Sequence, residues 1–124
     1  MNYKISQVAH LLAVSDDTVR RWIDDGRISA VPGTSPREVS GQSVAQYLRE
    51  RHPADASHHA SNRNLLEGIV LEVIRDRVVS QVVLQCGNYR IVSVITTEAV
   101  DALGLAPGVI ANAQIKATSV SVVK

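Results

Sequence analysis

Hydrophobic positions change their spacing near the middle of this 124-residue chain. In residues 1–52 they recur every three or four positions, which is typical of short helices with one buried face. In residues 61–124, Val- and Ile-rich runs are separated by short polar turns, which is typical of strands. Residues 53–60 begin with Pro53 and show no periodicity, so they are interpreted as a linker. The pattern therefore predicts a helical domain followed by a domain of strands.

Two short helices are predicted at the start of the chain. Ser6 is placed to cap the first helix, and Ser15 is placed to cap the second. About three residues separate them, and Gly26 ends the second helix. The buried stripe of the second helix is predicted to consist of Val19, Trp22 and Ile23. This arrangement has the geometry of a helix-turn-helix, which places its second helix in the major groove of DNA.

Polar side chains suited to DNA occupy the outer face of the second helix. Arg forms paired hydrogen bonds with guanine edges or phosphate oxygens, and Thr makes short contacts near the DNA backbone. Residues 32–37 form a tight loop that is suited to be a wing, and a third helix is predicted from about Ser40 to Arg51. The alternative is that Arg20 and Arg21 are solvated and pair with neighbouring aspartates.

An ordered set of motifs covers roughly residues 3–51. It consists of residues 3–9, residues 14–23, which contain Thr-Val-Arg-Arg-Trp at residues 18–22, and Gly-Arg-Ile at residues 26–28. This set resembles the DNA-binding module of the MerR and excisionase-like superfamily. The resemblance implies double-stranded DNA as a partner, with Arg27 and Arg37 at phosphates. The implied DNA-binding residues are Ser15, Asp17, Thr18, Arg20, Arg21, Arg27 and Arg37.

The second half predicts a small barrel. The expected strands are residues 68–74, 78–84, 89–95, 109–117 and 119–123. A short helix over residues 96–103 has Thr96 at its cap and Gly104 at its end. The predicted fold class is α+β: a winged helix-turn-helix followed by a five-stranded β-barrel of the oligonucleotide/oligosaccharide-binding (OB) type. Several strands are apolar on both faces, so the outer face is expected to meet another subunit.

Four separated motifs of the second half occur in a recognisable order. They are Ser-Asn-Arg-Asn-Leu-Leu-Glu-Gly at residues 61–68, residues 94–105, Pro-Gly at residues 107–108, and Ile-Lys-Ala-Thr-Ser-Val at residues 115–120. Together they resemble a Mop domain of the molbindin and ModE type, which is TOBE-like, over residues 61–124. In that family the domain binds molybdate or tungstate between subunits. The implied ligands are Ser61, Asn62, Arg63, Thr96, Lys116, Ala117 and Thr118.

The chemistry of a tetrahedral dianion explains these residue types. Its charge calls for cations such as Arg63 and Lys116, and its remaining oxygens call for hydroxyl and backbone N–H donors. Thr96 lies where a helix begins, so its hydroxyl is placed near free N–H groups. The related domains often have Ser where this chain has Ala99, which removes a hydrogen bond worth about 1–3 kcal/mol. Thr97 or a backbone N–H is the alternative donor. The alternative for both cations is a surface position on a structural barrel.

Charge and composition exclude several other classes of protein. Residues 1–53 carry seven Lys and Arg against six Asp and Glu, so DNA binding has to rest on local arrangement. The lone Cys86 is interpreted as a small apolar strand residue. His58 and His59 lack the further ligands of a metal site. No catalytic pair or metal set emerges, so an enzyme is not expected. The sequence shows no bilayer-spanning run and no signal peptide, which predicts a cytoplasmic protein with no membrane partner.

The combined prediction is a DNA-binding transcriptional regulator that senses molybdate or tungstate. A homo-oligomer is expected, either a dimer or a trimer of dimers through the Mop domains. One alternative is a molybdate storage or buffering protein in which the helices serve assembly. Another is an excisionase-like DNA binder with no anion response. The sequence is compatible with activation or repression and with a preference for molybdate or tungstate. It is also compatible with coupled or independent binding of DNA and the anion.

Overall fold

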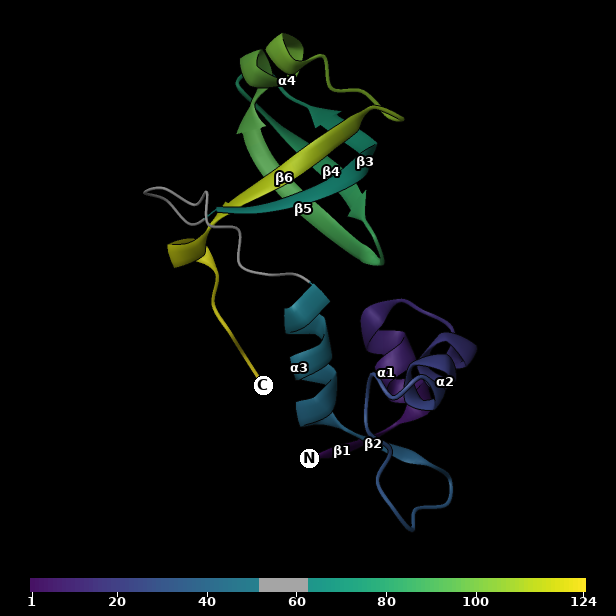
Figure 1. Cartoon of the computed structure of the whole chain (residues 1–124). Helices are drawn as coiled ribbons and strands as arrows, with labels where there is room; N and C mark the ends of the chain where they lie inside the picture. The colour runs from purple at the N-terminus through teal and green to yellow at the C-terminus, as the bar shows by residue number, and fades with distance from the viewer. Residues whose placement is uncertain (52–62) are drawn as a thin grey trace. The chain divides into compact units, whose positions relative to one another are not determined.

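The computed structural model describes residues 1–51 and 63–124 (Figure 1). The chain divides into two compact units, Met1–Ala56 and Ser57–Lys124. The described residues do not include the predicted domain boundaries or the linker over residues 53–60. They also do not include His58, His59, Ser61 and Asn62. None of the described helices is long and apolar enough to cross a membrane.

The first unit is built around a helix-turn-helix, as predicted. Strand β1 (Asn2–Lys4) leads directly into helix α1 (Ile5–Leu12), and residues 13–15 connect it to helix α2 (Asp16–Asp24). Ser15 caps α2, since its hydroxyl accepts the Thr18 backbone N–H at 3.1 Å. Ala13 adopts a left-handed conformation with φ 56°, which turns the chain between the helices.

The predicted cap at Ser6 is wrong. Helix α1 already includes Ser6, because β1 pairs with strand β2 (Glu38–Ser40) and brings the chain into the helix at Ile5. The backbone N–H of Lys4 donates instead to the side-chain carbonyl of Gln7 at 2.9 Å. The boundary was set by a long-range strand pairing that the local sequence does not reveal.

The predicted wing is a closed loop between α2 and β2. Ala30 bridges Val39, and the Val31 N–H donates to the Glu38 carbonyl at 2.8 Å. The Thr34 hydroxyl accepts the Glu38 N–H at 2.9 Å, which holds the base of the loop closed. Helix α3 (Gly41–Arg51) follows β2 directly and agrees with the predicted third helix.

The core of the first unit fixes the position of α2. Val19 of α2 and Val39 of β2 are completely buried. The rings of Trp22 and Tyr47 meet edge to face with centroids 5.2 Å apart, which joins α2 to α3. Because one face of α2 is held in this way, its polar face is presented outward on a rigid support.

The second unit is a curled antiparallel sheet with one helix at its end (Figure 1). Its elements are β3 (Arg63–Arg75), β4 (Val79–Cys86), β5 (Tyr89–Thr96), α4 (Thr97–Leu103) and β6 (Ile110–Lys116), in the sheet order β5-β4-β3-β6. Val70, Val82, Leu84 and Val100 form the buried core. The predicted α+β class with an OB-like barrel is confirmed. Cys86 is buried in β4, as expected of a small apolar residue.

Two predicted features of the barrel are wrong. Residues 119–123 do not form a fifth strand: Ala117–Ser119 is a short 3₁₀ helix, and Val122 and Val123 are 92% and 90% exposed. Alternating apolar residues favour a strand, but no described strand lies beside them to satisfy their backbone groups. Strand β3 begins at Arg63 instead of residue 68, because it pairs with β6 along the whole of residues 63–69.

The outer face of the sheet is apolar and exposed, in agreement with the prediction of two apolar faces. Leu65 and Val94 are 64% and 66% exposed, and Ile69, Leu71, Ile74, Val79 and Val92 are each exposed by more than 40%. Exposed apolar side chains gathered on one face of a sheet in this way are uncommon on a monomeric protein.

Candidate functional site

The polar face of α2 carries the side chains predicted to contact DNA. Asp17, Arg20 and Arg21 are exposed, and Thr18 is half-buried. The Ser15 and Thr18 hydroxyl oxygens lie 2.9 Å apart, and Ser15 also caps the helix. Ser15 therefore has a structural role in the free protein, while the arginines of this face remain accessible to a ligand.

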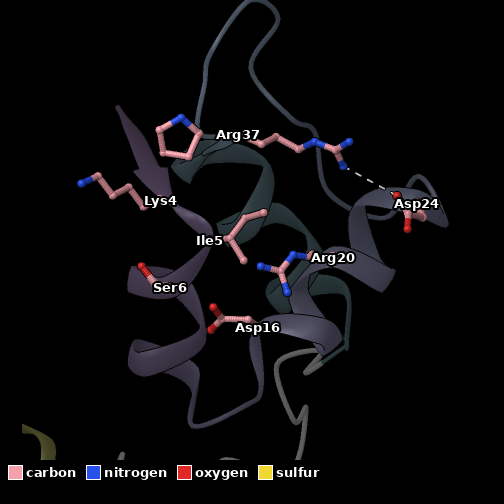
Figure 2. Close-up of a pocket in the computed structure, with 8 residues that line it drawn as sticks. Lys4, Ile5, Ser6, Asp16, Arg20, Asp24 and Arg37 are labelled. Carbon is pink, nitrogen blue, oxygen red and sulfur yellow. Dashed lines mark ion pairs between the residues drawn. The ribbon is translucent and has the colours of Figure 1, made fainter.

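Arg20 and Arg37 line one open surface pocket of about 500 Å³ (Figure 2). The first turn of α1, helix α2 and the wing loop contribute its walls. Figure 2 shows Arg20 and Asp16 pointing into the space between the two helices, and Arg37 reaching toward Asp24. Lys4 and Ser6 also line this pocket. The sequence did not predict that these two residues lie at this pocket, because the pairing of β1 with β2 was not predicted.

Arg27 lies apart from this pocket. It lines a separate surface hollow of about 400 Å³ together with Ser43, Tyr47 and Glu50. Its guanidinium donates to the Tyr47 hydroxyl at 3.2 Å and lies 5.9 Å from the centre of that ring. The hydrogen bond to Tyr47 raises the pKa of Arg27 above its ordinary value. The structure thus groups Arg20 with Arg37, and Arg27 separately.

Three of the predicted DNA-contacting arginines pair with aspartates in the free protein. Arg20 lies 3.0 Å from Asp17, Arg37 lies 3.7 Å from Asp24, and Arg27 lies 3.9 Å from Asp25. The alternative that neighbouring aspartates neutralise this face is therefore observed for Arg20. Because all of these side chains are half-exposed or more, the pairs are open to exchange with another anion.

Arg63 and Lys116 face each other in the second unit. They are direct partners in the antiparallel ladder between β3 and β6, at its outer end. The Asn64 side-chain amide donates to the Ile115 carbonyl at 3.1 Å and reinforces this end of the ladder. Ala117 and Thr118 follow in the 3₁₀ turn. Folding alone therefore brings both predicted cations to one edge, and no second chain is needed to join them.

Thr96 lies at the other end of the barrel. It pairs with Val79 next to the start of α4, close to the end of β3 that carries Arg75. Strand β3 runs for 13 residues from Arg63 to Arg75, at roughly 3.3 Å per residue. One copy of the chain therefore does not bring Thr96 to Arg63 and Lys116.

The hydrogen bonds at the start of α4 separate two neighbouring threonines. The Thr96 hydroxyl oxygen accepts the Ala99 backbone N–H at 3.1 Å, so its own hydrogen remains free to donate. The Thr97 hydroxyl oxygen lies 2.6 Å from the Asp76 carbonyl and 2.7 Å from the Ser80 hydroxyl. The Thr97 hydroxyl is thus already engaged within the fold. It is not free to replace the serine hydroxyl that related domains often have at the position of Ala99.

We expect Thr97→Val to destabilise the second unit by about 1–3 kcal/mol, because the buried Ser80 hydroxyl would lose its partner. Oxyanion binding should be unchanged. Thermal unfolding and calorimetric titration of the same variant measure the two effects. Thr96→Val is the matched comparison and should weaken oxyanion binding; equal oxyanion affinities for the two variants would contradict the assignment of Thr96.

Metal-binding side chains do not converge in the described parts of the chain. No group of three or more His, Cys, Asp or Glu residues there is arranged to hold a metal ion. The cationic and hydroxyl side chains at the two ends of the barrel are instead suited to an anion.

Two domain families match the chain. The TOBE domain family matches residues 60–122, and a helix-turn-helix domain family matches residues 3–52. A molybdate binding protein from Sporomusa ovata is 35% identical over 53% of this chain and 98% of its own, with a TM-score of 0.50. MopII from Clostridium pasteurianum is 33% identical over 53% of this chain and 100% of its own, with a TM-score of 0.49. No curated protein matches the chain.

Proposed function

We infer the function from the premise that the chain belongs to the TOBE domain family and carries a helix-turn-helix domain before it. We propose that this protein is a cytoplasmic DNA-binding regulator that responds to molybdate or tungstate. The two matched families are binding domains, and the chemistry of both units is that of anion recognition. One unit offers arginines on an exposed helix, and the other offers paired cations at the edge of a barrel.

The observation that carries the anion assignment is the pairing of Arg63 with Lys116 across the β3–β6 ladder. Two adjacent exposed cations repel each other weakly in water, and an anion between them replaces that repulsion by attraction to both. A dianion can accept hydrogen bonds from both Arg63 and Lys116. Thr118 and its chain neighbours supply a hydroxyl and backbone N–H groups beside the two cations. The similarity to the molybdate binding protein from Sporomusa ovata supports molybdate as that dianion.

We further propose that the complete site forms between copies of the chain. Arg63, Lys116, Ala117 and Thr118, together with Ser61 and Asn62, come from one copy, and Thr96 comes from another. This arrangement accounts for the position of Thr96 at the opposite end of β3. It also gives a reason for the exposed apolar outer face, because a second copy would cover it. A dimer or a trimer of dimers satisfies both requirements.

DNA contact is proposed for the face formed by α2 and the wing. Thr18, Arg20 and Arg21 are placed to enter a major groove, with Arg37 at the phosphate backbone. Lys4 adds a cation on the α1 side of the same pocket. The anion then acts on DNA binding by fixing the assembly, and so the spacing of the helix-turn-helix units.

One titration of the full chain with molybdate, followed by calorimetry and by sedimentation, tests the ligand and the assembly together. Saturating molybdate should change the affinity for a selected operator about 5- to 150-fold, which is the usual range of coupling between sites. Equal operator affinity with and without molybdate would disprove the coupling. Several oxyanions bound per oligomer, with no high-affinity operator, would instead identify a storage protein. An absence of heat with molybdate and tungstate would identify a DNA binder without an anion response.

A further inference from the structure

The aspartates beside the predicted DNA-contacting arginines form a repeated pattern. Each of three arginines, from three different segments, has a carboxylate within 4 Å. Arg20 is hydrogen-bonded to Asp17 at 3.0 Å, whereas Arg37 with Asp24 at 3.7 Å and Arg27 with Asp25 at 3.9 Å are longer ionic contacts. All three carboxylates belong to α2 or to its C-terminal cap. The helix that is proposed to enter the groove therefore carries the negative partners of the cations around it.

These pairs add little to the stability of the fold. The side chains of Asp17 and Asp24 are 84% and 72% exposed, and the arginine side chains are each more than half exposed. Exposed ion pairs of this kind usually contribute almost nothing measurable to folding. Ion pairing for stability therefore does not explain why the carboxylates are present.

The position of two of these carboxylates argues further against a role in stability. Asp24 is the last residue of α2 and Asp25 is its C-cap, where the negative end of the helix dipole disfavours a carboxylate. Asp17 lies in the first turn of α2, where the helix dipole favours a carboxylate, so it also stabilises the helix. Asp24 and Asp25 therefore give the sharper test.

The same carboxylates decide the charge of the first unit. Residues 1–53 carry seven Lys and Arg against six Asp and Glu, so the unit has almost no net charge. Without Asp17, Asp24 and Asp25 it would be clearly basic. A basic body binds any DNA through its phosphates, independent of sequence. These three residues thus keep the unit from behaving as a general polycation.

We propose that Asp17, Asp24 and Asp25 are specificity-determining residues that compete with DNA phosphates for Arg20, Arg37 and Arg27. On random DNA, binding breaks the intramolecular ion pairs and brings the carboxylates close to phosphates, which repel them. The free energy gained from phosphate contacts alone does not offset these two costs. At a DNA site whose sequence fits α2, contacts of this helix with base edges supply the remaining free energy of binding. This inference rests on the proposed DNA-binding function and deepens it, since it concerns the choice between matched and random DNA.

Single charge-neutralising variants test the competition. Asp24→Asn and Asp25→Asn should each tighten binding of the full chain to a random-sequence duplex about three-fold, and the triple variant with Asp17→Asn about ten-fold or more. Fluorescence anisotropy at low salt measures the affinity. The gain should shrink as salt is added, because screening weakens both the ion pairs and the repulsion. Affinity for an operator selected with the wild-type chain should rise less, so the ratio of specific to random binding should fall.

Asp101→Asn is the matched control. Asp101 forms an exposed pair with Arg75 at 2.7 Å in the second unit, so the variant changes the net charge equally without touching the proposed interface. It should leave affinity for random DNA within about two-fold of the wild type. Equal effects of Asp24→Asn and Asp101→Asn would overturn the proposal. It would also fall if Asp24→Asn weakened operator binding and left random binding unchanged, because Asp24 would then only position the wing.

The failure of this inference is distinguishable from the failure of the proposed function. If the wild type and every variant bind no duplex at low salt, DNA binding itself is disproved, and the competition with it. If the wild type binds an operator and responds to molybdate while the aspartate variants match the control, the proposed function stands and only the competition is wrong.

Discussion

Replacing Arg63 by Ala is expected to weaken molybdate binding about ten- to hundred-fold, which corresponds to the loss of one hydrogen bond to a charged group. Lys116→Ala should have an effect of the same order, because the two side chains face each other in the β3–β6 ladder. The double variant should lose less than the product of the two effects, since both cations are proposed to contact the same ligand. Calorimetric titration of the full-length variants measures all three affinities.

Arg90→Ala serves as the control for the loss of a cation. Arg90 is an exposed arginine of β5 that is paired with Gln85 of β4, and it is not one of the proposed oxyanion ligands. The single Trp22 lies in the first unit, so its fluorescence reports whether that unit remains folded in every variant. Oxyanion affinity that is unaffected by Arg63→Ala and Lys116→Ala would mean that both residues are surface charges at the end of a strand.

Gly68→Ala is expected to destabilise the second unit by about 2–4 kcal/mol. A Cβ at this position would collide with the backbone carbonyl of Gln85 and would lie 2.6 Å from the Cys86 sulfur. The carbonyl belongs to β4, which is paired on both sides, so it has little freedom to move away. Thermal unfolding followed by circular dichroism measures the loss, and Trp22 fluorescence separates it from unfolding of the first unit.

Glu67→Ala is the neighbouring control for this variant. Glu67 is exposed on the same strand, so its truncation should change stability by less than about 0.5 kcal/mol. An unfolding temperature of Gly68→Ala equal to that of Glu67→Ala would show that β3 and β4 separate easily at this point. The close approach of the two strands would then not be required for the fold.

Local chemical signals made most of the first unit predictable. The Ser15 cap, the short turn before it and the end of α2 near Gly26 each depend on residues close in sequence. The strand β1 was missed because its three residues are held by pairing with β2, more than thirty positions away. The helix-turn-helix resemblance is confirmed by the family match over residues 3–52.

The second unit was predictable where turns and caps define it. Thr96 and Gly104 delimit α4 as expected, and the alternating burial of β6 follows the alternation in its sequence. The predicted last strand failed because β-propensity without a neighbouring strand leaves backbone groups unpaired. The Mop resemblance is confirmed by the TOBE family match and by the similarity to the molybdate binding protein from Sporomusa ovata.

The candidate anion site shows where sequence reasoning reaches its limit. The cation pair was expected from the resemblance, but the direct alignment of Arg63 with Lys116 is a matter of strand register. Thr97 was an alternative donor by its position, yet the partners that engage it, Asp76 and Ser80, come from the turn before β4 and from β4 itself. Only the folded arrangement separates a free hydroxyl from an engaged one.

The cap formed by Thr96 has a consequence for the choice among tetrahedral anions. Since its oxygen accepts the Ala99 N–H, the Thr96 hydroxyl hydrogen is left to donate to a ligand, and Arg63 and Lys116 are donors only. Hydrogen phosphate keeps one proton at neutral pH and would place it against these donors, whereas molybdate, tungstate and sulfate are fully ionised. The three donors Thr96, Arg63 and Lys116 would therefore favour a fully ionised dianion over hydrogen phosphate, a choice made by protonation state and not by size.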